Sequence, residues 1–273
     1  MAAVSFFDSA LARRLEAMEA FCCVDTARSV ARIRPEISSA AEQIAGGWAV
    51  FTGVGSPISE ARGLGMDGPV TADDMDRLES FYHSRGDAIR IEVCPLSDPT
   101  LHQLLATRGY RLLEFSNMLA RPLGDGQSME SPAANGRITT RIAASSEGPI
   151  WAETVARCFA GQMPITQELI DVVSCWTQST IGACYFAHLD GEIAGGGRVA
   201  MNAAVALLGG AGTVERFRNR GVQQALIAAR LAHAVRTGCD LAMTVTLPGS
   251  GSQRNCERYG FQVAYTRAKF ILE

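Results

Sequence analysis

The sequence contains almost no lysine and very little histidine. Lys269 is the single lysine, so arginine supplies nearly all of the 25 basic side chains, and only four histidines are present. The eight cysteines include no CxxC pair, so the ligand pattern of a structural zinc site is missing and no bound metal is expected. A net charge of -3 without a basic stretch argues against nucleic acid as a partner.

Long hydrophobic runs are also missing. No apolar stretch is long enough to cross a bilayer, so no membrane partner is expected. Residues 1–23 mix acids and arginines with apolar side chains, which is typical of an amphipathic helix and not of a secretion signal. We therefore expect a cytoplasmic protein with reduced, buried thiols. With 273 residues, 47% hydrophobic, the chain can bury one large core or two of ordinary size.

Turn residues and hydrophobic periodicity predict alternating helices and strands in the first half. The expected helices cover residues 6–22, 37–44, 71–85 and 99–108, and the expected strands cover 30–34, 48–51, 88–94 and 111–120. Thr71 precedes an acid-rich first turn, which is typical of a helix N-cap.

A Gly-, Pro- and Ser-rich stretch over residues 122–136 is the best linker in the chain. We therefore predict domains over 1–121 and 137–273. In the second, the Asp190-Gly191 pair indicates a β-hairpin. The other expected elements are strands over 137–143, 203–213, 241–246 and 261–272, and helices over 148–159, 166–178, 222–237 and 252–259.

The two halves of the sequence resemble each other weakly. When Gly109 is aligned with Gly260, Gly86 falls opposite Gly238, and the helix over 71–85 falls opposite that over 222–237. Such a repeat predicts two copies of one α/β (α+β) fold, each a mixed, mostly antiparallel twisted sheet flanked by helices. At the position of Gly221 the first half has Pro69, and it has no arginine-rich turn.

The stretch from Thr213 to Arg236 carries the clearest chemical signal. A strand end leads through three arginines to Gly221 and then into an Ala/Leu-rich helix. A helix N-terminus after such a turn offers free backbone N–H groups and a positive dipole end to an anion. Arginine side chains add charge that can pair with phosphate.

With these residues the second half resembles the GNAT acetyltransferases. Their signature turn, Q/R-x-x-G-x-G/A, reads Arg218-Asn219-Arg220-Gly221-Val222-Gln223 here, so the last position departs from the pattern. The resemblance covers about residues 137–273 and includes the hairpin and a late helix ending in Gly-Phe. The first half looks like a degenerate copy, so the whole chain resembles the tandem GNAT proteins.

The resemblance implies acetyl-CoA as the donor, with its pyrophosphate on the start of the helix and its pantetheine arm along the preceding strand. Asn255, on the late helix, is a further expected contact. The implied cofactor-binding residues are Gly212, Thr213, Val214, Arg218, Asn219, Arg220, Gly221, Val222, Gln223, Gln224, Ala225 and Asn255.

Catalytic residues are less clear from the sequence. Cys256 stands where the family frequently has a tyrosine acid, and a thiol can protonate a thiolate, although a small packing residue is the alternative. Tyr259 and Tyr265 are other candidate acids, and Glu215 is a candidate base whose alternative role is a solvated loop carboxylate. Trp151 and Trp176 either border the acceptor or pack in the core, and Gly195-Gly196-Gly197 predicts a bulge or a close approach.

We therefore expect an N-acetyltransferase that moves an acetyl group from acetyl-CoA to a primary amine of a small-molecule acceptor, by direct attack in a ternary complex. A non-catalytic acyl-CoA-binding or regulatory protein is the alternative, because the tyrosine is missing and the first half has lost the motif. The protein is expected to be a monomer or a homodimer.

Overall fold

The computed structural model describes residues 7–124, 136–158 and 165–273, which group into two compact units. The first unit contains residues 7–119, 245–248 and 263–273, and the second contains 120–124, 136–158, 165–244 and 249–262. Most of the predicted linker, residues 125–135, lies outside the described part of the chain. Within the described residues, no helix has the length and apolar content needed to cross a membrane.

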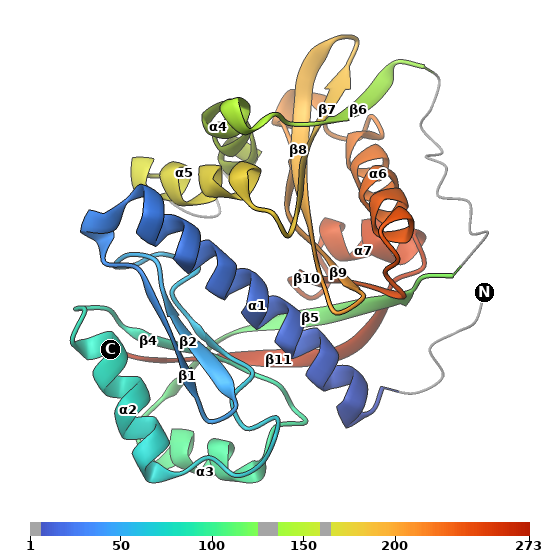
Figure 1. Cartoon of the computed structure of the whole chain (residues 1–273). Helices are drawn as coiled ribbons and strands as arrows, with labels where there is room; N and C mark the ends of the chain where they lie inside the picture. Colours follow the sequence, from blue (N-terminus) through green and yellow to red (C-terminus); the bar gives the residue numbers. More distant parts are fainter. Residues whose placement is uncertain (1–6, 125–135, 159–164) are drawn as a thin grey trace. The chain divides into compact units, whose positions relative to one another are not determined.

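The first unit is a mixed sheet with helices on its faces (Figure 1). Its strands lie in the order β1-β2-β3-β4-β11-β5, with β3 parallel to β4 and antiparallel pairs at β1-β2, β2-β3 and β4-β11. Its elements are α1 (Ser9–Ile33), η1 (Pro35–Ile37), β1 (Ala40–Ile44), β2 (Gly47–Phe51), β3 (Ala61–Arg62), α2 (Ala72–His83), β4 (Ile89–Val93), α3 (Pro99–Thr107), β5 (Arg111–Pro122) and β11 (Gln262–Leu272).

The second unit repeats this plan. Its strands lie in the order β10-β9-β8-β7-β6, with β9 parallel to β10 and the other pairs antiparallel. Its elements are β6 (Ile138–Ile142), η2 (Ser145–Glu147), α4 (Gly148–Cys158), α5 (Gln167–Ser174), η3 (Cys175–Gln178), β7 (Gly182–Leu189), β8 (Glu192–Asn202), β9 (Val205–Thr213), η4 (Glu215–Phe217), α6 (Val222–Arg236), β10 (Leu241–Thr246) and α7 (Gly251–Arg258).

Both units contain a crossover from one strand through a helix to a parallel strand. In the first unit it is β3-α2-β4, and in the second it is β9-α6-β10. The helices that were aligned in the sequence therefore occupy the same place in the two units. The predicted fold class, a mixed and mostly antiparallel sheet flanked by helices, is confirmed.

Two predicted elements are wrong. Residues 30–33 continue α1 and do not form a strand, because Cys23, Ala27 and Val30 keep the helical spacing on the buried face. The expected helix over 37–44 is the short η1 followed by β1, where pairing of Ala40 with Phe51 stabilises an extended chain. The Asp190-Gly191 hairpin is confirmed, with φ of 52° and 86° at its two turn residues.

The last strand does not belong to the unit that the predicted domain boundaries assign it to. We expected residues up to 273 to complete the second domain. Instead β11 runs antiparallel to β4, with Phe270 opposite Ile91 and Leu272 opposite Ile89. The chain's C-terminal strand is thus part of the first unit.

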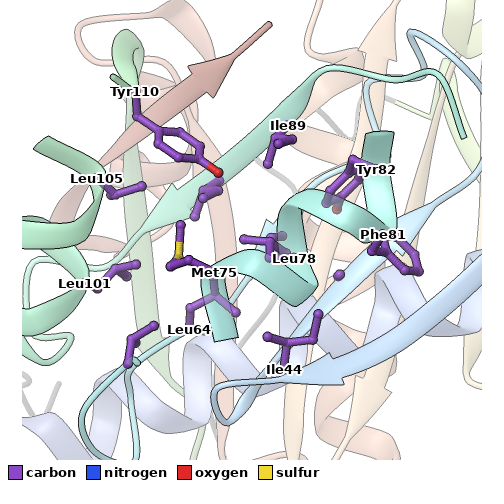
Figure 2. Packing of buried hydrophobic residues seen from close by; sticks show 14 of the residues in the cluster. Ile44, Leu64, Met75, Leu78, Phe81, Tyr82, Ile89, Leu101, Leu105 and Tyr110 are labelled. Carbon is purple, nitrogen blue, oxygen red and sulfur yellow. The ribbon is translucent and has the colours of Figure 1, made fainter. Parts of the chain in front are cut away.

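The hydrophobic core of the first unit lies between its sheet and the helices α2 and α3. Met75 and Leu78 of α2 are buried there in one cluster with Leu101 and Leu105 of α3 and Ile89 of β4 (Figure 2). The apolar side chains of α2 follow the i, i+3 spacing that turns one helix face to the sheet.

The side of the first unit that faces α1 is filled with charge. We call this group the buried ionic cluster; its members are Glu16, Glu19, Glu60, Arg62, Glu92, Arg267 and Lys269. Arg62 Nη1 lies 2.7 Å from Glu19 Oε1, and Lys269 Nζ lies 2.8 Å from Glu60 Oε1. Arg267 pairs with both Glu16 and Glu19. Four carboxylates thus share three cations, and one carboxylate is in excess.

Candidate functional site

Strands β9 and β10 separate in the middle of the second unit. They pair only from Val205–Leu241 to Leu207–Met243, although β9 continues to Thr213. At the point of separation Thr244 Oγ1 donates a hydrogen bond of 2.8 Å to the Leu208 carbonyl. Beyond it, no β10 residue in the described chain pairs with β9. The second part of β9 therefore offers an edge to which an extended ligand can add as a strand.

The polar groups at the end of β9 support this use of the edge. Val214 N–H donates to Ala194 O of β8 at 2.9 Å, so alternation directs Thr213 N–H to the opposite edge. The Thr213 hydroxyl is buried and forms no hydrogen bond with a described residue. A buried hydroxyl without a partner costs about 1–3 kcal/mol. A ligand lying along this edge would supply the missing partner.

The turn before α6 places backbone N–H groups together. Asn219 and Gly221 both have left-handed backbones, with φ of 61° and 88°. Gly221 is the N-cap, no side chain caps the helix, and its first turn contains no acid. Ala225 N–H donates to Gly221 O at 3.0 Å, whereas the N–H groups of residues 222–224 find no acceptor in the described chain. Uncapped N–H groups at a helix start are groups to which an anion can bind.

The three arginines of the turn have different surroundings. Arg216 Nη2 lies 2.8 Å from Glu192 Oε2, and its guanidinium stacks on Phe217. Arg218 reaches the Cys158 carbonyl at 3.5 Å and remains half exposed. Arg220 lies on the exposed surface of the turn. Arg218 and Arg220 therefore keep guanidinium surface that an anion on the helix end can meet.

The candidate catalytic side chains lie around this opening with unequal accessibility. Cys256 of α7 is buried, and burial raises the pKa of its thiol to about 11 although Arg230 opposes the shift, so the group is protonated at neutral pH. Tyr259 ends the same helix and is half-buried. Glu215, in η4, has a side chain that is 89% exposed. Asn255 Oδ1 accepts a hydrogen bond from Arg258 at 3.3 Å.

Tyr265, the other candidate acid, has its hydroxyl bound by a carboxylate. It lies on β11 in the first unit, where its hydroxyl donates to Glu16 Oε1 at 2.7 Å. Desolvation raises its pKa far above the ordinary tyrosine value. The Tyr265 hydroxyl is thus engaged within the first unit, and its contacts give no support to the acid role predicted for it.

A bulge lies at the predicted Gly195-Gly196-Gly197 triplet, but its extra residue is on the partner strand β9. The pairing of β8 with β9 shifts register between Gly196 and Arg198. A Cβ on Gly196 would lie 3.0 Å from Trp151 Nε1, and one on Gly197 would lie 3.0 Å from Arg230 Cζ. The glycines thus admit a tryptophan on the α4 side of the sheet and an arginine on the α6 side (Figure 1).

The two tryptophans differ in exposure. Trp151 is fully buried, and its Nε1 donates to the Tyr185 carbonyl at 2.9 Å, so it packs in the core. Trp176 is half-buried and covers Gly210 of β9, while Arg198 stacks on its ring. Only Trp176 keeps surface with which it can border an acceptor.

Sequence reasoning missed the Thr213 hydroxyl and Arg230. Arg230 had a signal: it lies four residues after Leu226 and four before Ala234, on the buried face of an Ala/Leu-rich helix. Among the described residues, no three His, Cys, Asp or Glu side chains are placed to hold a metal ion.

One family model matches part of the chain. Residues 152–261 match the model of the Acetyltransferase (GNAT) family. No curated protein sequence matches the chain. The matched range covers β7 to α7, and so includes the turn at Gly221 and the separated strands.

Solved structures show the same fold over most of the chain. A GCN5-related N-acetyltransferase from Kribbella flavida aligns with a TM-score of 0.65 and 18% identity, over 90% of this chain and 95% of that one. A tandem GNAT protein from the clavulanic acid biosynthesis pathway aligns with a TM-score of 0.60 and 14% identity, over 83% and 78%. A GCN5-related N-acetyltransferase from Sphaerobacter thermophilus gives 0.55 and 21%, over 68% and 60%.

Proposed function

We propose that the chain is an N-acetyltransferase for a small-molecule amine, because residues 152–261 match the Acetyltransferase (GNAT) family model. The observation that carries the proposal is the uncapped start of α6 beside the unpaired edge of β9. The fold of this family supports acetyl transfer from acetyl-CoA. The acceptor is a primary amine that attacks the thioester directly in a ternary complex.

The phosphates of acetyl-CoA bind at the start of α6. The free N–H groups of Val222, Gln223 and Gln224 donate to them, and Arg218 and Arg220 add positive charge. Ala225, which was expected to contribute as well, uses its N–H within the helix. Gln223 in place of the family's small residue contributes through its N–H, so its side chain need not approach the phosphates.

The pantetheine arm pairs with the free edge of β9. Thr213 supplies its N–H to that edge, whereas Val214 uses its N–H to bind β8. The Thr213 hydroxyl gains a partner in an amide or carbonyl of the arm, which removes the cost of its burial. This orphaned hydroxyl and the free helix N–H groups are independent features that fit the same extended, anionic ligand.

Acetyl transfer then requires a neutral amine and a way to accommodate the leaving thiolate. The amine nitrogen bonds to the carbonyl carbon, the C–S bond breaks with its electron pair on sulfur, and the amine loses one proton. Cys256 and Tyr259 of α7 are the proposed proton donors to the thiolate. Glu215, being solvated, accepts the amine proton through water.

The proposal is tested first by binding. Acetyl-CoA at millimolar concentration should raise the unfolding temperature, since a ligand that binds only the folded state stabilises it. Gly221→Glu should abolish the shift, because the residue has a φ of 88° and a carboxylate there repels phosphate. Gly238→Glu is the matched control, since Gly238 has a φ of 79° just beyond the other end of α6. A wild-type protein that shows no shift contradicts the proposal.

A non-catalytic acyl-CoA-binding protein is the second candidate, favoured by the buried, protonated Cys256 in the position of the family's tyrosine. Release of free CoA from acetyl-CoA across a library of primary amines separates the two. Turnover with any amine rejects the non-catalytic function. Cys256→Ala and Tyr259→Phe then identify the proton donor. The substitution that removes the donor should lower kcat, and the other should leave kcat nearly unchanged.

A further inference from the structure

Strand β9 contains a bulge within its unpaired part. Gly196 pairs with Gly212, and Arg198 pairs with Gly209, so Gly210 and Ala211 lie opposite Gly197 alone. Gly210 has a φ of 49°, and a Cβ on it would lie 2.5 Å from the Trp176 ring. The bulge directly precedes the end of β9, so its shape sets the direction of the N–H groups there.

Arg230 of α6 holds the base of this bulge. Its Nη1 donates to Arg198 O at 3.2 Å and to Gly209 O at 3.4 Å, the cross-strand pair that borders the bulge. Its Nε donates to Leu226 O of its own helix at 2.9 Å. One guanidinium thus joins α6, β8 and β9, and the missing side chain at Gly197 provides the space for it.

The surroundings of Arg230 are costly for a cation. The side chain is 1% exposed, its hydrogen-bond partners are backbone carbonyls, and it forms no ion pair with a described carboxylate. Burial lowers its pKa to about 10, which still leaves it charged at neutral pH. Burying an ion without a counter-ion costs several kcal/mol, and an apolar side chain of the same volume would fill the space at less cost. Packing alone does not account for an arginine here.

We propose that Arg230 is a positioning residue for acetyl transfer, which fixes the β9 bulge so that the N–H groups of Ala211 and Thr213 face the thioester carbonyl. The inference rests on the proposed function. As the amine bonds to the carbonyl carbon, charge develops on the carbonyl oxygen before the C–S pair leaves with sulfur. N–H groups held toward that oxygen stabilise the charge, and a loosened bulge no longer aims them.

The test compares Arg230→Met with Arg230→Lys. Met keeps the apolar volume, and Lys keeps the charge but lacks the several N–H donors of the planar guanidinium. Arg137→Met, at an exposed ion pair with Asp190, is the control for the substitution itself. Three quantities are measured: the Kd for CoA, kcat with the best amine of the library, and the carbonyl stretch of bound acetyl-CoA labelled at its carbonyl carbon.

Arg230→Met should lower kcat at least about tenfold, since tenfold corresponds to 1.4 kcal/mol of lost transition-state stabilisation. The Kd for CoA should change less than about twofold, because the phosphates bind at the start of α6 and not at Arg230. The carbonyl stretch should move toward its value in water. Arg230→Lys should fall between Met and the wild type, and Arg137→Met should match the wild type.

Equal kcat and an unshifted carbonyl stretch in Arg230→Met overturn the inference while leaving the proposed function intact. A parallel loss of CoA affinity and kcat also overturns it, since that reports general damage. If Arg230→Met does not fold, Gly197→Ala gives the same comparison, because its Cβ presses on the guanidinium at 3.0 Å. A wild-type protein that fails to bind CoA contradicts the proposed function instead.

Discussion

The two units begin their crossover helices in opposite ways. At α2, Thr71 caps the helix, and Thr71 and Asp74 exchange hydrogen bonds in a capping box, with Asp73 also in the first turn. At α6, the N-cap is Gly221, and neither a side-chain cap nor an acid is present. At α2 the Thr71 hydroxyl accepts from Asp74 N–H and the Asp74 carboxylate accepts from Thr71 N–H, whereas α6 leaves its first N–H groups for a ligand. A repeated fold can thus lose an anion site without losing the helix that made it.

The same contrast extends to the sheets. In the first unit β3 and β4 carry members of the buried ionic cluster, so that side of the sheet is filled by side chains. In the second unit β9 and β10 separate and leave backbone groups unpaired. The first unit is stabilised because its polar groups pair with one another. The second unit can bind a ligand because some of its backbone groups are left unpaired. Four substitutions test this contrast, from the largest expected effect to the smallest.

Removing the central cation of the buried ionic cluster should strongly lower the free energy of unfolding of the first unit. Arg267→Met leaves Glu16 and Glu19 buried beside it without their main partner, which should cost about 3–5 kcal/mol. Urea unfolding measures the loss. Arg111→Met, at an exposed pair with Glu273, should cost less than about 1 kcal/mol. A loss for Arg267→Met as small as the control's would mean that the cluster adds little to stability.

Giving α6 the acid that α2 has should close its anion site. Gln224 is the third residue of α6, as Asp74 is of α2, so Gln224→Asp places a carboxylate at the helix start, where it repels a phosphate. The Kd for CoA should rise at least about tenfold, or 1.4 kcal/mol. Calorimetric titration measures it, with Gln224→Asn as the neutral control. Equal affinity in the two variants would show that these N–H groups do not meet the phosphates.

Opening the α2 terminus should weaken the first unit modestly. Asp74→Ala removes one half of the capping box and should cost about 1 kcal/mol, while Asp73→Ala, which makes no capping bond, should cost less. Hydrogen bonds from Thr71 hold the pKa of Asp74 below its ordinary value. Its stabilising effect should therefore be present above the ordinary pKa and disappear as the pH falls through the lowered one. Thermal unfolding between neutral and acidic pH checks both effects, and equal losses in the two variants would contradict the capping role.

The excess carboxylate of the buried ionic cluster should give a small pH dependence of the opposite sign. Burial raises the pKa of Glu16, and Arg267 only partly offsets this. Its contribution to stability is thus full below the unfolded pKa and is lost as the pH rises through the folded one. Glu16→Gln should unfold at a higher temperature than the wild type at pH 8, and this advantage should shrink at pH 5. A difference that does not vary with pH would show that Glu16 is not the group that takes up the proton.

Glu19 should behave in the reverse way during acid unfolding. Burial alone would raise its pKa, but Arg267 and Arg62 outweigh burial and lower it to about 2. Its stabilising effect is accordingly present above the ordinary value and lost as the pH falls toward 2.

Much of the candidate site could be predicted from the sequence because its signals are local. Gly221, the arginines and the following helix are contiguous, and the glycine triplet of β8 lies opposite the bulge in β9. What could not be predicted depends on distant partners. Residues 40–44 are helix-forming by composition but form a strand because they pair with β2. The sequence places Arg230 on a helix, but only the structure shows that it donates to the carbonyls of Arg198 and Gly209.

The pairing of β11 was beyond sequence reasoning for the same reason. Its alternating residues predict a strand, but strand partners are chosen across the whole chain. Only the structure places Arg267 and Lys269 of this strand beside Glu19 and Glu60.

The position of β11 has a consequence for biosynthesis. Residues 262–272 are synthesised well after residues 7–119, yet they pair with β4 and supply two cations to the buried ionic cluster of the first unit. The first unit therefore cannot complete its interior until β11 has been made, although N-terminal domains usually fold first. A nascent chain halted before residue 262 would hold four buried-type glutamates with a single arginine among their partners. Synthesis of β11, and not the emergence of residues 7–119, sets the moment at which the first unit can become native.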